Sequence, residues 1–229
     1  MHEKTPASSF RLPFFGAAVV AALLWGLAGN AVAGDTKVMR IVFFGDSLTS
    51  GYGIDPDETY PALIQKKIER RGWPFQSMNA GVSGETTAGG VRRIDWVLRQ
   101  PVDVFVLALG GNDGLRGLPV DSTAENLREI FNRVRTRHPD AVLVLAGMRM
   151  PPNMGETYIR EFAGLFPKLA AETEALLIPF FLEGVGGVPE MNLPDGIHPT
   201  AEGHKVMAET VWKSIEPALR RRVAEGRGQ

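Results

Sequence analysis

The sequence contains no cysteine. This absence excludes a thiolate nucleophile, any disulfide and any metal site with cysteine ligands. An excess of charge of one sign is also lacking, because 25 basic residues stand against 26 acidic ones and leave a formal net charge of −1. No general electrostatic field therefore attracts the chain to nucleic acid or to an anionic membrane surface. We expect no nucleic-acid partner.

The longest hydrophobic run lies near the N-terminus, after Lys4 and Arg11. Its core, residues 14–27, is shorter than the roughly 20 residues that a membrane-spanning helix needs. Ala31-Val32-Ala33 has the small residues of a cleavage site. The pattern predicts a signal peptide over residues 1–33, cleaved after Ala33, and a periplasmic or secreted protein without a stable membrane anchor. The alternative is an N-terminal anchor that is not cleaved.

The remaining chain, residues 34–229, alternates between short apolar runs and longer amphipathic segments. The apolar runs are typical of buried parallel strands, and they cover residues 39–44, 75–80, 102–109, 141–146 and 176–181. Apolar residues at helical spacing predict helices over residues 60–71, 87–98, 123–137, 158–173 and about 201–220. Five strands separated by helices predict an α/β fold, a three-layer αβα sandwich around a five-stranded parallel sheet. With no internal repeat or linker, we expect one domain and a monomer.

Polar, glycine-containing segments follow three of the predicted strands, at residues 45–47, 81–84 and 110–113. In open parallel sheets, ligands bind outside the carboxyl ends of the strands. The functional site is therefore expected at this edge of the sheet. A fourth segment of this kind, residues 195–199, stands between the last predicted strand and the last predicted helix.

Ser47 follows the first predicted strand and is a candidate nucleophile. A serine hydroxyl attacks well only when a base removes its proton. His198 is the best placed base, because the other two histidines beyond residue 33 lie in a predicted loop and on the last predicted helix. Asp195, three residues before His198, can fold back and orient the imidazole. A turn followed by a helix cap also explains each segment taken by itself.

Three groups can stabilise an oxyanion: the backbone N–H groups of Ser47 and Gly81 and the side-chain amide of Asn112. Taken singly, a glycine is explained by a positive φ angle and an asparagine by a turn. Taken together, at three separate strand ends, the groups provide the donors that ester hydrolysis requires.

The polar segments form four ordered blocks that resemble those of the GDSL/SGNH hydrolase superfamily. The blocks are Gly45-Asp46-Ser47-Leu48, Asn79-Ala80-Gly81, Gly110-Gly111-Asn112-Asp113 and Asp195-Gly196-Ile197-His198-Pro199. Residues 82–90, 109–118 and 177–181 resemble the periplasmic arylesterase, thioesterase I and lysophospholipase L1 group within it. The resemblance covers nearly all of residues 34–229, which it identifies as an SGNH hydrolase domain.

The resemblance implies a flavodoxin-like fold and a serine esterase that works through an acyl-serine intermediate. The implied substrates are small-molecule aryl or short-to-medium acyl esters, together with acyl thioesters or lysophospholipids. The resemblance further implies the triad Ser47–Asp195–His198, an oxyanion hole of Ser47, Gly81 and Asn112, and neither metal nor cofactor. A carbohydrate O-acetylesterase of the same superfamily and a non-catalytic envelope binding protein are the alternatives.

Apolar side chains beside these blocks are candidates for binding an acyl chain. Leu115, Leu118, Met150 and Pro151 are predicted to contact substrate, and ordinary packing beneath surface loops is the alternative. Asp46 and Asp113 also raise the possibility of a magnesium site, since Mg²⁺ binds one or two carboxylates. No further acidic cluster follows a strand, so no metal is expected.

Overall fold

The structure, a computed structural model, describes residues 38–226. Five parallel strands form one sheet in the order β2-β1-β3-β4-β5, which is the flavodoxin-like order. The strands are β1 (Met39–Gly45), β2 (Phe75–Gly81), β3 (Val104–Ala108), β4 (Val142–Ala146) and β5 (Leu176–Ile178). The predicted parallel sheet is confirmed. The predicted signal peptide, residues 1–33, lies outside the described residues and stays a prediction.

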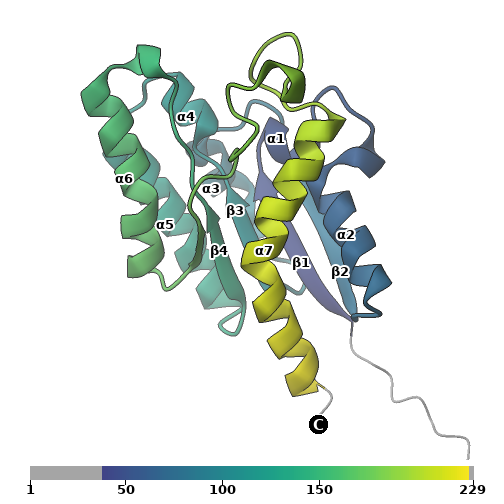
Figure 1. Ribbon diagram of the computed structural model, residues 1–229. Coiled ribbons are helices and arrows are strands. Elements are labelled where there is room, and N and C mark those ends of the chain that lie inside the picture. The colour runs from purple at the N-terminus through teal and green to yellow at the C-terminus, as the bar shows by residue number, and fades with distance from the viewer. Residues whose placement is uncertain (1–37, 227–229) are drawn as a thin grey trace, which may run out of the picture. The chain divides into compact units, whose positions relative to one another are not determined.

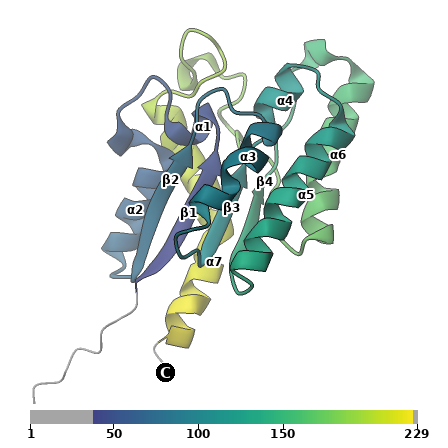
Figure 2. The ribbon, with the colours of Figure 1, turned by 180° about the vertical axis from the view of Figure 1, so that it is seen from behind.

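Helices cover both faces of the sheet, which confirms the three-layer αβα arrangement. The helices are α1 (Ser47–Ser50), α2 (Tyr60–Arg70), α3 (Thr87–Val97), α4 (Gly111–Leu115), α5 (Val120–Arg137), α6 (Glu156–Glu172) and α7 (Ala201–Gly226). Figure 1 views the molecule from the side of α7, which packs on α2, and Figure 2 from the side of α3 and α5, which pack on each other. Among residues 38–226, no helix is long and apolar enough to span a membrane.

The central strands β1 and β3 are buried on both faces, as their continuous apolar sequences indicate. Successive residues of a strand point to opposite faces. Phe43 therefore packs against Tyr60 of α2, with ring centroids 5.4 Å apart, while Phe44 packs against Phe105, which contacts Phe131 of α5. These buried aromatic residues hold the ends of β1 and β3 in fixed positions beneath the loops that follow them.

The observed elements differ from the predicted ones mainly at their ends. β5 stops at Ile178 rather than at residue 181, because Pro179 has no N–H to donate to a strand ladder. The chain turns there toward Gly147, whose carbonyl accepts the N–H of Phe181 at 2.8 Å. The last helix continues beyond residue 220 to Gly226. The short helices α1 and α4 fall within segments that the sequence predicts only as polar loops.

Candidate active site

The carboxyl ends of β1, β2 and β3 lie side by side, because Gly45 pairs with both Gly81 and Ala108. Ser47 begins α1 directly after β1, and Asn112 is the second residue of α4 after β3. Figure 1 shows α1 and α4 together at the upper end of the sheet. The polar segments therefore meet at one sheet edge, as expected from their position after the strands.

Local hydrogen bonds define how α1 presents Ser47. The carboxylate of Asp46 caps the helix by accepting the N–H of Leu48 at 3.0 Å. Gly51, with a φ of 79°, ends the helix and donates its N–H to the carbonyl of Ser47 at 3.0 Å. A helix of one turn leaves the N–H of its first residue without a partner inside the helix. The backbone N–H of Ser47 is therefore left for a ligand or solvent.

Ser47, His198 and Asp195 form one hydrogen-bonded chain. The distance between Ser47 Oγ and His198 Nε2 is 3.0 Å, and His198 Nδ1 lies 2.7 Å from Asp195 Oδ2. The second carboxylate oxygen of Asp195 accepts the backbone N–H groups of Ile197 and His198, at 2.8 and 2.9 Å. A proton can thus move from the serine hydroxyl to an imidazole whose other nitrogen is held by a carboxylate.

The hydrogen bonds to Asp195 also fix its charge. The backbone N–H of His198, then its imidazole and the N–H of Ile197, lower the pKa of Asp195 from 3.8 to about 2. Asp195 is therefore ionised at any ordinary pH and can stabilise a positively charged imidazole.

The other described histidines have different partners. His138 places Nε2 3.1 Å from the carbonyl of Leu98. His204 is buried in α7, where Nδ1 accepts the backbone N–H of Tyr60 at 3.1 Å, and burial lowers its pKa to about 4. Both histidines thus have partners other than Ser47. The expectation from sequence that His204 would be exposed or lightly packed is wrong, because His204 is buried, and His138 is half-buried rather than solvated.

Tyr52 contacts the imidazole of His198 and was missed by the sequence analysis. Their ring centroids are 4.4 Å apart, and the N–H of Tyr52 donates to the carbonyl of Ser47 at 3.1 Å. Tyr52 is 53% exposed, so it covers one side of the histidine while facing solvent. No spacing rule marks this residue, because the contact joins segments far apart in the sequence.

Gly81 is required by close packing and not by its φ angle, which corrects one of the interpretations offered from sequence. It is absent from the glycines with positive φ. A Cβ atom at Gly81 would lie 2.2 Å from the backbone nitrogen of Ser50 in α1. The N–H of Gly81 donates to the side chain of Asn79 at 3.0 Å, and Asn79 in turn donates to the carbonyl of Thr49 at 2.8 Å. Glycine thus allows β2 to approach the helix that carries Ser47.

The side-chain amide of Asn112 is held by two acceptors. Its nitrogen donates to the backbone carbonyl of Glu85 at 3.0 Å and to Asp46 Oδ2 at 3.2 Å. These bonds connect α4 with the loop after β2 and with the residue that precedes Ser47. The amide is therefore positioned before any ligand binds.

Asp46 and Asp113 are both buried, but they serve separate hydrogen-bond networks. Burial raises the pKa of Asp46 from 3.8 to about 6, although the bonds from Leu48 and Asn112 oppose this shift. Asp113 accepts the N–H and the hydroxyl of Thr87, at 2.9 and 2.5 Å, at the start of α3. Within the described part of the chain, no group of three or more histidine, cysteine, aspartate or glutamate residues is placed to hold a metal ion.

The four predicted substrate-contacting residues have different environments. Leu115 and Leu118 are 43% and 36% exposed, and Pro151 is exposed as well. Met150 is buried beneath α4, where its sulfur would lie 2.2 Å from a Cβ atom at Gly114. The alternative of ordinary packing therefore describes Met150 better than a contact with substrate does.

Several exposed apolar residues belong to the segments that carry Ser47, Gly81, Asn112 and His198 or follow directly after them. They belong to the segments after β1 and β2, to α4 and its end, and to the residue before His198. These side chains are Tyr52, Val82, Leu115, Leu118 and Ile197. An apolar group attached to a polar reacting centre would find favourable contacts here.

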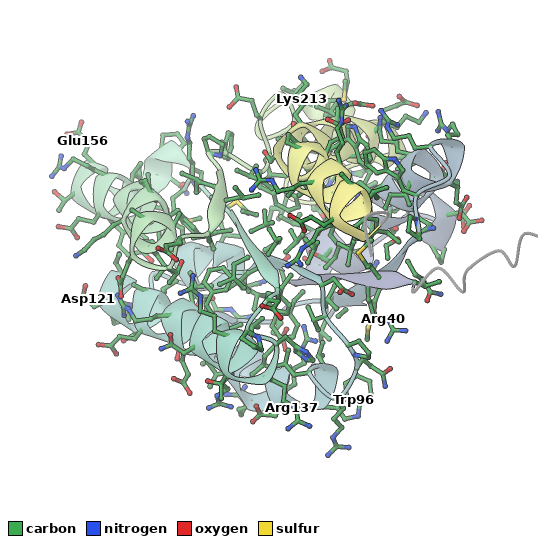
Figure 3. The ribbon with its side chains drawn as sticks, turned by 90° about the horizontal axis from the view of Figure 1, so that it is seen from below. Arg40, Trp96, Asp121, Arg137, Glu156 and Lys213 are labelled. Carbon is green, nitrogen blue, oxygen red and sulfur yellow. The ribbon has the colours of Figure 1, made fainter. Side chains whose placement is uncertain are left out.

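A separate hollow of about 550 Å³ lies at the opposite, amino ends of the strands. Arg40, Gln76, Trp96 and Arg99 line part of it, and Figure 3 labels Arg40 and Trp96 at this end of the molecule. Its lining contains no histidine or carboxylate that could serve as an acid or base. Although this hollow is large, its lining lacks the groups that a catalytic centre needs.

The fold and site define a class of protein. A serine at a strand end, bonded to an imidazole and through it to a carboxylate, with amide donors nearby, is the arrangement of a serine hydrolase. The chain belongs to the GDSL-like lipase/acylhydrolase family, whose model matches residues 43–206. It is an enzyme that hydrolyses ester bonds, so the alternative of a non-catalytic binding protein is not favoured.

Similar proteins cover most of the chain. Esterase TesA of Pseudomonas aeruginosa is 37% identical over 180 residues, which are 78% of this chain and 89% of the relative. Thioesterase 1/protease 1/lysophospholipase L1 of Escherichia coli (strain K12) is 35% identical over 194 residues, 84% of this chain and 89% of the relative. The crystal structure of the psychrotrophic esterase EstA from Pseudoalteromonas sp. matches with a TM-score of 0.74 at 31% identity and covers 79% of this chain and 98% of that one.

Proposed function

We propose that Ser47 is the nucleophile of this esterase, that His198 is its general base and acid, and that Asp195 orients and stabilises the imidazole. The single observation that carries the proposal is the hydrogen-bonded chain from Ser47 Oγ to His198 Nε2, 3.0 Å, and from His198 Nδ1 to Asp195, 2.7 Å. These distances fall within the range required of a nucleophile and its base.

The reaction proceeds in two steps. First, Ser47 Oγ attacks the acyl carbon while His198 Nε2 takes the hydroxyl proton, and the alcohol or thiol then leaves with that proton. Second, water attacks the acyl-serine while His198 takes a proton from it, and Ser47 regains the proton as the acid departs. The related esterase EstA is inhibited by monoethylphosphonate. A phosphonate bound to a serine resembles a tetrahedral intermediate, so this inhibition supports the same intermediate for Ser47.

The backbone N–H groups of Ser47 and Gly81 and the amide of Asn112 are proposed to bind the oxyanion. In the structure, the N–H of Gly81 donates to Asn79 at 3.0 Å, and the amide of Asn112 donates to Asp46 at 3.2 Å. A developing negative charge is a stronger acceptor than the side-chain amide of Asn79, so the N–H of Gly81 shifts toward the oxyanion without having to be ordered first. The amide of Asn112 keeps its bond to the carbonyl of Glu85 and exchanges the longer bond to Asp46 for the oxyanion.

Replacement of Asn112 by alanine is expected to lower kcat by roughly 10²–10³-fold, the usual effect of losing one oxyanion donor. KM should change little, because the amide acts mainly on the transition state. Steady-state kinetics on a p-nitrophenyl ester measure both constants. Asn126→Ala is the matched control, since the side-chain amide of Asn126 donates to the hydroxyl of Thr87, at 3.1 Å, and not to a group of the proposed site. A folded Asn112→Ala enzyme with the kcat of the wild type would contradict the assignment.

The proposed substrates are aryl and short-to-medium acyl esters, with acyl thioesters or lysophospholipids as further members of the class. The exposed apolar residues on the segments next to Ser47, Gly81, Asn112 and His198 support an acyl or aryl group with more apolar surface than acetate. The names of the Escherichia coli relative, a thioesterase and lysophospholipase, agree with this class. A carbohydrate O-acetylesterase would need no such apolar surroundings.

The substrate class is tested with p-nitrophenyl esters from acetate to palmitate, measured beside an acyl thioester. The expected kcat/KM rises from acetate toward acyl chains of intermediate length and falls again at palmitate, because each buried methylene adds about 0.8 kcal/mol of transfer free energy until the apolar surface is covered. A kcat/KM that is highest for acetate and falls with every added methylene would instead support the O-acetylesterase.

A further inference from the structure

The guanidinium of Arg93, a residue of α3, reaches the carboxyl ends of two strands. Its Nη2 donates to the carbonyl of Ala80 at 2.8 Å and to the carbonyl of Gly45 at 3.2 Å. The guanidinium carbon lies 3.9 Å from the centroid of the Phe44 ring. One side chain thus joins β1 and β2 just before Ser47 and Gly81.

Arg93 also binds the loop that follows β2. Its Nε donates to both carboxylate oxygens of Glu85, at 2.7 and 2.8 Å, and its Nη2 bonds the same carboxylate. The Glu85 side chain is only 7% exposed and that of Arg93 is 21% exposed. A shielded, forked ion pair of this kind fixes geometry better than a pair at the surface. The backbone of Glu85 is therefore held in place by Arg93.

These two contacts lead to two of the three proposed oxyanion donors. The carbonyl of Ala80 and the N–H of Gly81 belong to the same planar peptide group. A hydrogen bond to that carbonyl fixes the direction of the N–H and polarises it toward a stronger donor. The carbonyl of Glu85 accepts the amide of Asn112 at 3.0 Å. Arg93 therefore contacts the Ala80–Gly81 peptide directly and reaches the amide of Asn112 through Glu85.

We propose that Arg93 is a positioning residue that sets the oxyanion hole through the Ala80–Gly81 peptide and through Glu85. The inference rests on the proposed function of Gly81 and Asn112. Arg93 acts through these groups and touches no reacting atom. A lysine cannot replace it, because an ammonium group lacks the forked geometry that bonds a carboxylate and two carbonyls at once.

The test is the Arg93→Lys variant, which keeps the positive charge. Its kcat on a p-nitrophenyl ester is expected to fall roughly 10- to 100-fold, as misplaced catalytic groups commonly do, while KM changes less than about threefold. The inhibition constant of phenylboronic acid, which forms a tetrahedral anionic adduct with a serine, should rise in proportion to the loss of kcat. Arg133→Lys is the matched control, because Arg133 also bonds two carboxylates and a carbonyl, those of Asp95, Glu129 and Val91.

Titration of active sites with a p-nitrophenyl phosphonate separates positioning from folding. If Arg93 only supported the fold, the titrated fraction would fall, while kcat per active site and the boronate constant would match those of Arg133→Lys, and the proposal would be overturned. In the double variant with Asn112→Ala, the loss from Arg93→Lys should be smaller than in the wild type, because one of its two targets is gone. Fully multiplicative losses would also overturn it.

The outcomes distinguish this inference from the proposed function itself. A large loss in Asn112→Ala together with an unchanged Arg93→Lys enzyme would reject only the role of Arg93. Full activity in both Ser47→Ala and Asn112→Ala would reject the proposed catalytic site.

Discussion

Replacing Ser47 with alanine is expected to lower kcat for ester hydrolysis by roughly 10⁶-fold, the loss found when a triad nucleophile is removed. The substitution deletes only the Oγ atom that lies 3.0 Å from His198 Nε2. The backbone of α1, and with it the N–H of Ser47, is set by the cap at Asp46 and the turn at Gly51, so the fold should be unaffected. Release of p-nitrophenolate at high enzyme concentration measures the remaining rate.

Ser50→Ala is the matched control for this experiment. Ser50 belongs to the same short helix, and its hydroxyl donates to the carbonyl of Ser47 at 3.3 Å and contacts the hydroxyl of Ser83 at 3.0 Å. It does not contact His198, so the control is expected to keep kcat within a few-fold of the wild type. A Ser47→Ala enzyme that retained a tenth of the wild-type kcat would show that another group attacks the ester.

Replacing Asp195 with asparagine is expected to lower kcat by roughly 10⁴-fold, since a neutral amide favours the wrong imidazole tautomer. Asp195 Oδ2 accepts the Nδ1–H of His198 at 2.7 Å, and Oδ1 accepts two backbone N–H groups. Asparagine keeps one acceptor for the backbone but loses the charge that stabilises a protonated imidazole. Steady-state kinetics on the same esters measure the loss.

The pH dependence supplies a second check on Asp195. Its pKa is lowered to about 2, so it stays ionised through the range in which esters can be assayed, and its protonation should cause no loss of wild-type activity above about pH 3.

The control for the Asp195→Asn variant is Asp121→Asn, which also removes one negative charge. Asp121 is exposed in the first turn of α5. A loss of less than tenfold in Asp195→Asn would contradict the proposed role.

The sheet could be predicted from sequence because each central strand carries its own signal. The apolar residues of β1 and β3 are continuous, and a strand buried on both faces requires this pattern. The helices α1 and α4 could not be predicted, since they have four and five residues and show less than two turns of periodicity. Their ends depend on caps such as Asp46 and on Gly110, whose φ is 113°.

The hydrogen-bonded chain of the candidate site was also predictable, because Ser47 follows a strand and His198 follows Asp195 at a short spacing. Contacts between distant segments were not. Tyr52 meets His198 across the fold, and Arg93 looks like an ordinary solvated arginine of α3 until its bonds to Ala80 and Glu85 are known. The burial of Met150 beneath α4 likewise depends on how the loop after β4 folds back.

The central claim is that the hydroxyl of Ser47 becomes covalently attached to the acyl group. Its most direct test is mass spectrometry of the enzyme after reaction with a p-nitrophenyl alkylphosphonate, in which a bond forms from the nucleophile to phosphorus and p-nitrophenolate leaves. We predict one phosphonyl group per chain, located at Ser47, and none in the Ser47→Ala variant. A group attached at any other residue, or ester hydrolysis by an enzyme that the phosphonate does not label, would contradict the account.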